Sequence, residues 1–423
     1  MKNTNTIQVF EHERLTTNHS KFSKRHLNAL LKLNEYHDHT YFDAIPDGVK
    51  FNQHVGIIQI DGLTIEIHPK ADKNDNNSKW RNVLLQMLIA CGKLKASTAG
   101  SANVNRQNLN LLEVYFELFL TEVSQLIRQG LVKQYRKETN NVKALKGKLE
   151  FAGNIRKNLI HKERFYTKHQ IYDSDHLLHQ VIQRALEILE QFSKGTYLFD
   201  RCKRVIIDFP EVKRIHVSKN LLDKIILNRK TAPYSYALEI ARLIILNYSP
   251  DISSGNKKML SLLFDMNQLW EEFILVKLKK ALENTSYRAI GQSTRSFLGS
   301  HYLQPDIVIE NKYDPNEIYI IDTKWKLPTN NAASIADLRQ MYAYGRFWNA
   351  TKVMLLYPGI RTNKTFRSFR TDDYIKTDEG HQEIEHRCKL GFVSVVDESG
   401  KNLDSNIGKK VIEEMEIFYE CNG

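Results

Sequence analysis

The chain has 423 residues, of which 42% are hydrophobic and 26% charged, and its formal net charge is +12. This length suits two or three domains of ordinary globular composition, and the basic charge favours a polyanionic partner without proving one. No run of about 20 apolar residues is present, so a membrane span is not expected.

The four cysteines are far apart in the sequence and form no CxxC pair: Cys91, Cys202, Cys388 and Cys421. A zinc site is therefore not expected, and a reduced chain in the cytoplasm is the simpler interpretation. The first 15 residues lack the apolar run of a signal peptide, which agrees with a cytoplasmic location.

Residues 1–75 predict a small β-rich domain. Two apolar runs, 55–60 and 63–68, are separated by Asp61-Gly62, a dipeptide that strongly favours a tight hairpin. A short helix is expected at 21–33 because its leucines recur at helical spacing.

Residues 76–250 predict a mainly helical middle region. Apolar residues recur with the period of a helix in four segments, the last of them interrupted near Pro233: 80–91, 109–128, 177–192 and 221–246. The polar stretch 248–258 is the expected boundary before the C-terminal domain.

The most basic part of this middle region is 128–168, with twelve Lys or Arg residues and three acidic ones. Contact with DNA phosphates is one interpretation, and it predicts an affinity that falls steeply with salt. Two other interpretations of this segment are as well supported: a solvated face, or a surface that contacts an acidic partner. No helix-turn-helix or zinc-finger pattern for reading bases is present. The candidate DNA-binding residues are Lys133, Arg136, Lys137, Lys143, Lys146 and Lys148.

Residues 251–423 predict an α/β domain, with a mixed sheet flanked by helices. Its expected elements are a helix at 265–282, a hairpin with strands at 305–309 and 318–325, a helix at 334–348 and a buried strand at 353–357. Ser334 is the expected N-cap of the second helix.

Charged residues mark one end of the predicted hairpin. Asp322 and Lys324 share a face of the second strand, and Asp306 begins the first strand, so the hairpin can bring the two carboxylates together. Such carboxylates repel unless a cation lies between them, and a divalent metal with oxygen ligands meets that need. A metal, two carboxylates and a lysine suit phosphodiester hydrolysis, whereas an edge hairpin with solvated charges is the plain alternative.

These residues resemble the core of PD-(D/E)xK nucleases, with Pro305-Asp306 followed by Asp322-Thr323-Lys324. Gln340 and Tyr344, four residues apart on one helix face, resemble the QxxxY motif of RecB-like members. Glu271 matches the acidic residue that often completes such a site. The resemblance implies that Asp306 and Asp322 bind Mg²⁺ with the Thr323 backbone carbonyl, that Glu271 adds a carboxylate, and that Lys324 serves the attacking water or the phosphate. Gln340 and Tyr344 would orient the site or contact the DNA backbone, or simply pack the helix.

Most of the chain also resembles the McrC family, the nuclease subunits of McrBC-type, modification-dependent restriction systems. The stretches that carry this resemblance are 55–58, 65–70, 145–151, 264–271 and the nuclease motifs. It implies an Mg²⁺-dependent endonuclease that cuts double-stranded DNA in a GTP-dependent, methylcytosine-type restriction complex. It also implies that residues 1–75 dock on a ring-forming partner, an McrB-like AAA+ GTPase hexamer that reads the modified base.

Two other functions stay open. The chain could be a regulatory subunit that stimulates the GTPase and has a vestigial nuclease site, or a stand-alone RecB-like nuclease. The sequence contains no GxxxxGK[ST] phosphate loop, so GTP is expected to belong to the partner and not to this chain.

Overall fold

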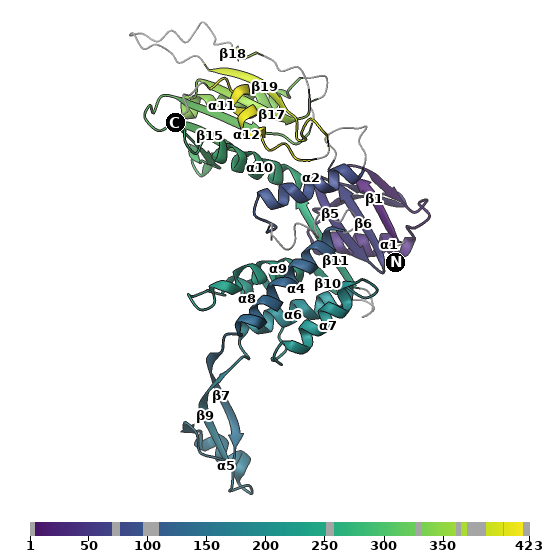
Figure 1. Cartoon of the computed structure of the whole chain (residues 1–423), viewed down its shortest axis with the longest axis vertical. Helices are drawn as coiled ribbons and strands as arrows, with labels where there is room; N and C mark the ends of the chain where they lie inside the picture. Colours follow the sequence, from purple (N-terminus) through teal and green to yellow (C-terminus); the bar gives the residue numbers. More distant parts are fainter. Residues whose placement is uncertain are drawn as a thin grey trace. The chain divides into compact units, whose positions relative to one another are not determined.

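The structure is a computed structural model of the chain (Figure 1), and it describes residues 5–69, 77–95, 110–250, 258–326, 328, 332–360, 365–369, 386–400 and 402–417. The chain divides into two compact units. One unit combines residues 1–58, 62–98 and 263–423, and the other contains 59–61 and 99–262. The expected regions 1–75 and 251–423 thus fall largely in the same unit, and the predicted boundaries of the middle region at 75/76 and 250/251 stay expectations.

The N-terminal part of the first unit is β-rich. Strand β1 (Thr6–Phe10) runs parallel to β6 (Leu63–His68), and β5 (His54–Ile60) lies beside β6. Asp61 and Gly62 both have positive φ, the backbone conformation that a tight Asp-Gly hairpin turn requires. The predicted hairpin at 55–68 is therefore confirmed.

Three further short strands and two helices complete this N-terminal part. The strands form a small sheet in the order β2 (Arg14–Thr16), β4 (Gly48–Phe51) and β3 (Phe42–Ile45). The helices are α1 (Lys24–Tyr36) and α2 (Asn77–Ala90), close to the two predicted positions.

The C-terminal part of the first unit contains a six-stranded mixed sheet. Its order is β12 (Tyr287–Gly291), β15 (Ile307–Asn311), β16 (Ile318–Thr323), β17 (Lys352–Pro358), β19 (Arg387–Val393) and β18 (Arg367–Ser368). The strands β12, β15 and β16 are antiparallel, whereas β16, β17 and β19 run parallel. The predicted hairpin is the β15–β16 pair, and the predicted buried strand is β17.

Helices cover this sheet. Helix α11 (Ile335–Trp348) begins at Ser334, whose side chain accepts the Asp337 backbone N–H as an N-cap. Its residues Met341, Tyr344 and Trp348 pack on Val308, Ile320 and other buried residues of the sheet in one hydrophobic cluster. Helices α10 (Met266–Ala281) and α12 (Ile407–Glu414) pack on each other and on β12, β16 and β19.

Sequence analysis missed two features here. Strand β12 lies at the sheet edge, and a separate hairpin of β13 (Arg295–Leu298) and β14 (His301–Leu303) precedes β15. Most residues of this small hairpin are exposed, so no alternation of apolar and polar residues marks its strands.

The second unit is mainly helical, as predicted. It contains α4 (Leu111–Gln129), α6 (Leu177–Phe192), α7 (Leu198–Asp208), α8 (Lys219–Asp223), the 3-10 turn Ala232–Tyr234, α9 (Ser235–Leu246), the strand β10 (Tyr248–Pro250) and the strand β11 (Lys258–Asp265) up to residue 262. The helix at Pro233 is interrupted as expected. Helix α7 was not predicted.

The basic segment forms an arm of this second unit. The antiparallel pair β7 (Gln134–Val142) and β9 (Phe165–Asp173), with β8 (Lys148–Leu149) and α5 (Phe151–Asn158), extends away from the helices of the same unit (Figure 1). No helix in the described part of the chain is long and apolar enough to cross a membrane.

Candidate active site

The register of the β15–β16 hairpin brings the two predicted aspartates together. Ile307 pairs with Ile321, so continuing the register by one residue puts Asp306 opposite Asp322. The flanking side chains Val308 and Ile320 are fully buried under α11, and Ile307 and Ile321 on the other face are fully buried too, so this part of the hairpin lies inside the core.

Asp306 is held by the residue that follows Asp322. One carboxylate oxygen of Asp306 accepts the Thr323 backbone N–H at 2.6 Å and the Thr323 hydroxyl at 2.9 Å. These two bonds hold the Asp306 side chain across the strand pair, which leaves its other oxygen for a further partner.

Lys324 lies in a carboxylate environment. Its Nζ is 2.6 Å from Asp322 Oδ2 and 4.0 Å from Asp337 Oδ1, in the first turn of α11. Burial alone would lower the pKa of Lys324, but the neighbouring carboxylates outweigh this and raise it. The lysine is therefore cationic at neutral pH and neutralises part of the negative charge of the site.

The two aspartates of the site have raised pKa values. Burial and the charge of Asp306 raise the pKa of Asp322 to about 6, although Lys324 opposes the shift. Burial also raises the pKa of Asp306, against the two hydrogen bonds from Thr323. Because the charge of Asp306 raises the pKa of the buried Asp322, a cation between the two carboxylates would stabilise the site.

Glu271 on α10 is the third carboxylate. Burial and the charges of Asp306 and Asp322 raise its pKa to about 7. Its Oε1 accepts the side-chain N–H of Gln292 at 3.1 Å, and the Gln292 backbone N–H donates to the Asp306 carbonyl at 2.9 Å. Gln292, which was not predicted, thus ties α10 to the start of the hairpin. The backbone φ angle of Gln292 is positive, and no pattern in the sequence predicts this contact with Glu271.

Gln340 and Tyr344 hold the chain just before Asp306. The Gln340 side-chain N–H donates to the Tyr344 hydroxyl at 2.7 Å, and this hydroxyl donates to the Gln304 carbonyl at 2.9 Å. In this arrangement the two residues position the backbone that carries Asp306. Tyr344 also packs in the hydrophobic cluster, and a role of the pair in catalysis or in contact with the DNA backbone stays a prediction.

The donor set suits Mg²⁺. Among the described residues, no three His, Cys, Asp or Glu side chains lie close enough to hold a metal ion by themselves. Mg²⁺, however, is commonly bound through one or two carboxylates, with waters and substrate phosphates completing its octahedron. Asp306 and Asp322, opposite each other and mutually repelling, fit that pattern.

The six candidate DNA-binding residues all lie on or near the arm of the second unit. Lys133, Lys137, Lys143, Lys146 and Lys148 are exposed. Arg136 differs, because its guanidinium donates to both carboxylate oxygens of Asp173 and pairs with Glu138 at 2.9 Å. Its charge is therefore already matched within the arm.

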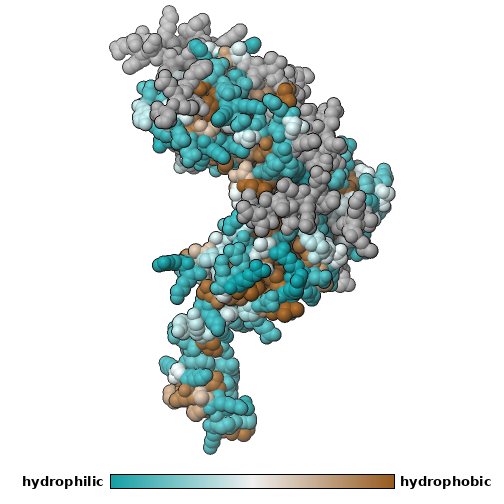
Figure 2. All heavy atoms as spheres, viewed as in Figure 1, coloured by the Kyte–Doolittle hydropathy of each residue, from teal (hydrophilic) through white to brown (hydrophobic). Residues whose placement is uncertain are grey.

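The same arm exposes apolar side chains that sequence analysis did not single out. Figure 2 shows hydrophobic surface toward its end, where five large side chains are 60% to 86% exposed: Leu145, Phe151, Ile155, Leu159 and Ile160. A surface with both lysines and exposed apolar residues suits a protein partner as well as a phosphate backbone.

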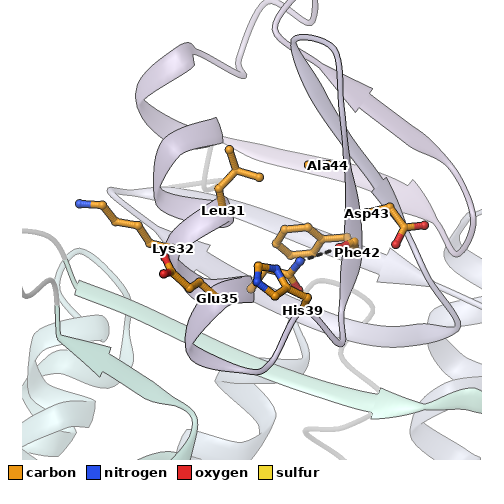
Figure 3. Close-up of a pocket in the computed structure, with 8 residues that line it drawn as sticks. Leu31, Lys32, Glu35, His39, Phe42, Asp43 and Ala44 are labelled. Carbon is orange, nitrogen blue, oxygen red and sulfur yellow. Dashed lines mark hydrogen bonds between the residues drawn. The ribbon is translucent and has the colours of Figure 1, made fainter.

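A depression of about 350 Å³ lies between α1 and β3, and none of the candidate site residues lines it (Figure 3). Leu31, Lys32, Glu35 and Phe42 are among its lining residues. Asn34, which also lines it, donates to the Phe42 carbonyl at 2.6 Å and accepts the Tyr41 backbone N–H at 3.0 Å. Because this amide already holds α1 against the sheet, we assign the depression a structural role.

Comparisons with known proteins agree with this architecture. Residues 49–358 match the family described as McrBC 5-methylcytosine restriction system component. The type IV methyl-directed restriction enzyme EcoKMcrBC of Escherichia coli K12 is 24% identical over 258 residues, which are 58% of this chain and 72% of that protein.

Two solved structures from Thermococcus gammatolerans are also similar. A half-complex of McrB AAA+ hexamers with bound McrC contains a chain that matches with a TM-score of 0.70 at 19% identity, over 97% of this chain and 99% of that one. The McrBC complex gives a TM-score of 0.50 at 21% identity, over 66% and 88%. At these identities the likeness establishes the fold.

Proposed function

Because this chain belongs to the family of McrBC 5-methylcytosine restriction system components, we propose that it is the endonuclease subunit of a modification-dependent restriction complex. The observation that carries the nuclease assignment is the group formed by Asp306, Asp322 and Lys324 at one end of the β15–β16 hairpin. The C-terminal part of the first unit is, in this proposal, a PD-(D/E)xK nuclease domain.

Each residue of the site has a defined task. Asp306, Asp322 and the Thr323 backbone carbonyl would hold Mg²⁺, with Glu271 bound directly or through a water. The metal would polarise a phosphoryl oxygen and lower the pKa of a bound water. Lys324 would position that water or offset negative charge on the phosphate in the transition state.

The fixed hydrogen bonds around these residues supply preorganisation. Thr323 orients Asp306, Gln292 orients Glu271, and the Gln340–Tyr344 pair fixes the chain at Gln304. Partners that orient the groups around a metal matter to catalysis because small displacements of reacting groups reduce rates strongly. These residues need not touch the substrate to affect cleavage.

Duplex DNA is the substrate that best suits the surroundings of the site. The β13–β14 hairpin leads directly into Asp306 and exposes three large side chains by 51% to 70%: Phe297, Leu298 and Tyr302. Apolar side chains on such a projection can wedge into a DNA groove next to the phosphate that is cut.

The partner in this proposal is an McrB-like AAA+ GTPase hexamer, which would use GTP and recognise the modified base. The likeness to McrC bound to McrB AAA+ hexamers supports this choice. Residues 1–75 remain the expected docking region, and the lysines and exposed apolar residues of the arm are a second candidate surface for the GTPase or for DNA.

Two alternatives make different predictions. A regulatory subunit with a vestigial site would stimulate GTP hydrolysis but not cut, and the intact Asp306, Asp322 and Lys324 argue against it. A stand-alone nuclease would cut without any partner, and the large part of the chain outside the nuclease region argues against that reading.

The test is a reconstituted cleavage assay. The purified chain, the AAA+ GTPase of the same system, GTP and Mg²⁺ are combined with methylated or unmethylated plasmid, and each component is omitted in turn. The proposal predicts cleavage of methylated plasmid in the complete mixture alone. GTP hydrolysis stimulated without cleavage would favour the regulatory subunit, and cleavage by the chain alone would favour the stand-alone nuclease.

A further inference from the structure

Three buried tryptophans meet within the first unit, next to the candidate site. Trp325 lies in the middle, with its ring centre 5.4 Å from that of Trp270 and 6.4 Å from that of Trp80. Both pairs have edge-to-face geometry, which aromatic rings prefer over a face-to-face sandwich. All three side chains are at most 3% exposed, so the cluster is closed to water.

Two members of this cluster are sequence neighbours of candidate site residues. Trp325 directly follows Lys324, and Trp270 directly precedes Glu271. The Lys324 backbone N–H also donates to the Leu356 carbonyl at 2.8 Å, which fixes this segment on its other side. The contact between Trp270 and Trp325 therefore sets the distance between the backbones that carry Glu271 and Lys324.

The remaining contacts of Trp325 come from the N-terminal part of the chain. Its indole N–H donates to Glu11 Oε1 at 2.6 Å, and Glu11 is 3% exposed. Glu11 directly follows β1, and its backbone N–H donates to the His68 carbonyl at 3.0 Å, at the end of β6. The acceptor for Trp325 is thus fixed by the β1–β6 strand pair.

Helix α2 supports Trp325 from another side, through Trp80. It carries Trp80, and the next residue, Arg81, is ion-paired with the buried Glu66 of β6. Burial raises the pKa of Glu66, but a hydrogen bond with His68 and the charge of Arg81 outweigh burial and lower the pKa to about 2, so the Glu66 carboxylate is charged at neutral pH. Strand β6 therefore holds α2, and α2 holds Trp80 against Trp325.

We propose that Trp325 is a positioning residue through which Glu11 and the N-terminal strands control the placement of Lys324 in the site. This rests on the proposed nuclease function and names its regulation: cleavage requires an intact N-terminal β1–β6 pair although none of its residues belongs to the site. A partner that shifts this strand pair would change the alignment of Lys324 with Asp322.

The test uses four variants in the complete complex. Trp325→Phe keeps an aromatic ring but removes the N–H donor, Glu11→Ala removes the acceptor, and Glu11→Gln restores an acceptor of the same shape. Glu317→Ala is the matched control, because it removes another hydrogen-bonded carboxylate of the first unit, whose partners are Tyr287, Tyr319 and Asn311 and not the tryptophans.

Two measurements are made on each variant. The first is cleavage kinetics. We expect Trp325→Phe and Glu11→Ala to lower kcat by about 10- to 100-fold, because a misplaced reacting group slows the chemical step. The KM for DNA and the stimulation of GTP hydrolysis should not change. The second is acylation of Lys324 by an amine-reactive reagent, followed by mass spectrometry on the chain alone, with the exposed Lys137 as internal reference. We expect the same two variants to raise labelling of Lys324 several-fold, and Glu11→Gln to restore both values.

Wild-type kcat and wild-type labelling in Glu11→Ala and Trp325→Phe would overturn the inference. An equal loss of kcat in Glu317→Ala would overturn it too, because it would indicate general destabilisation. If the wild-type complex does not cut DNA but Lys324 labelling responds as expected, the nuclease assignment fails while the positioning by Glu11 and Trp325 stands.

Discussion

Asp306 and Thr323 are joined across the hairpin by two hydrogen bonds to a single carboxylate oxygen, from the Thr323 backbone N–H at 2.6 Å and from its hydroxyl at 2.9 Å. Asp306 is therefore oriented by the residue next to Asp322, so the two proposed metal ligands cannot move independently. The proposed metal site therefore depends on the pairing register of β15 and β16, which places Thr323 beside Asp306.

Replacing Thr323 by Val should weaken the site without unfolding it. Val keeps the backbone bond and suits a buried strand, but it removes the hydroxyl that orients Asp306. We expect a loss of roughly 10- to 100-fold in Mg²⁺ affinity or in cleavage rate, as for other outer partners of metal ligands. Calorimetric titration with Mg²⁺ and cleavage assays measure the two quantities. Thr323→Ser retains the hydroxyl and should behave like wild type, and an equal loss in both variants would contradict this role.

Mg²⁺ binding should depend on pH. Asp322 and Glu271, with pKa values of about 6 and 7, hold protons that a metal must displace. Affinity should therefore fall as the pH is lowered below about 7, and binding should release protons. Calorimetry at two pH values in buffers of different ionisation enthalpy detects this release. An affinity that does not change between pH 6 and pH 8 would mean that these carboxyls are not ligands.

Tyr344→Phe should lower cleavage while preserving the fold. The phenylalanine ring can fill the hydrophobic cluster, but the hydroxyl that links Gln340 to the Gln304 carbonyl is lost. We expect a loss of roughly 10- to 100-fold in kcat, comparable to other positioning partners. Tyr342→Phe on the same helix is the control, because Tyr342 is 37% exposed. Full activity in Tyr344→Phe would leave helix packing as the role of this residue.

Tyr234 holds the chain at Val132, just before β7 of the arm begins. Its hydroxyl accepts the Val132 backbone N–H at 3.0 Å and lies 3.0 Å from His179 Nε2, where burial lowers the pKa of His179 to about 4. Tyr234→Phe leaves these groups without this partner, so we expect the free energy of unfolding of the second unit to fall by about 1–3 kcal/mol. Thermal denaturation measures this, with Tyr172→Phe as control, because Tyr172 belongs to the same unit and is 55% exposed. Equal melting temperatures would show that water replaces the hydroxyl.

Much of the site could be predicted because its residues lie on strongly patterned elements. The β-branched, apolar run of β16 and the turn before it predicted the hairpin, and a hairpin centred on that turn brings Asp306 close to Asp322. Ser334 marked the start of α11 through a local capping interaction.

Other features left no local signal. Gln292 reaches Glu271 because β12 and the β13–β14 hairpin place it there, and both elements were missed: β12 is short, and the hairpin is exposed. The sequence predicted the arm only as a basic segment. Its strands β7 and β9 were not predicted, because they are largely exposed and show no alternating apolar pattern. The bond between Glu11 and Trp325 joins residues 314 positions apart, a relationship that no local pattern can contain.

The most direct test of the account is the Asp322→Ala variant in the complete complex, with plasmid cleavage and GTP hydrolysis measured in the same reactions. We predict that cleavage of methylated plasmid falls by more than the roughly 100-fold typical of removing an outer partner of a metal ligand, while stimulation of GTP hydrolysis is unchanged. Cleavage that survives in Asp322→Ala at the wild-type rate would show that the end of the β15–β16 hairpin is not the active site.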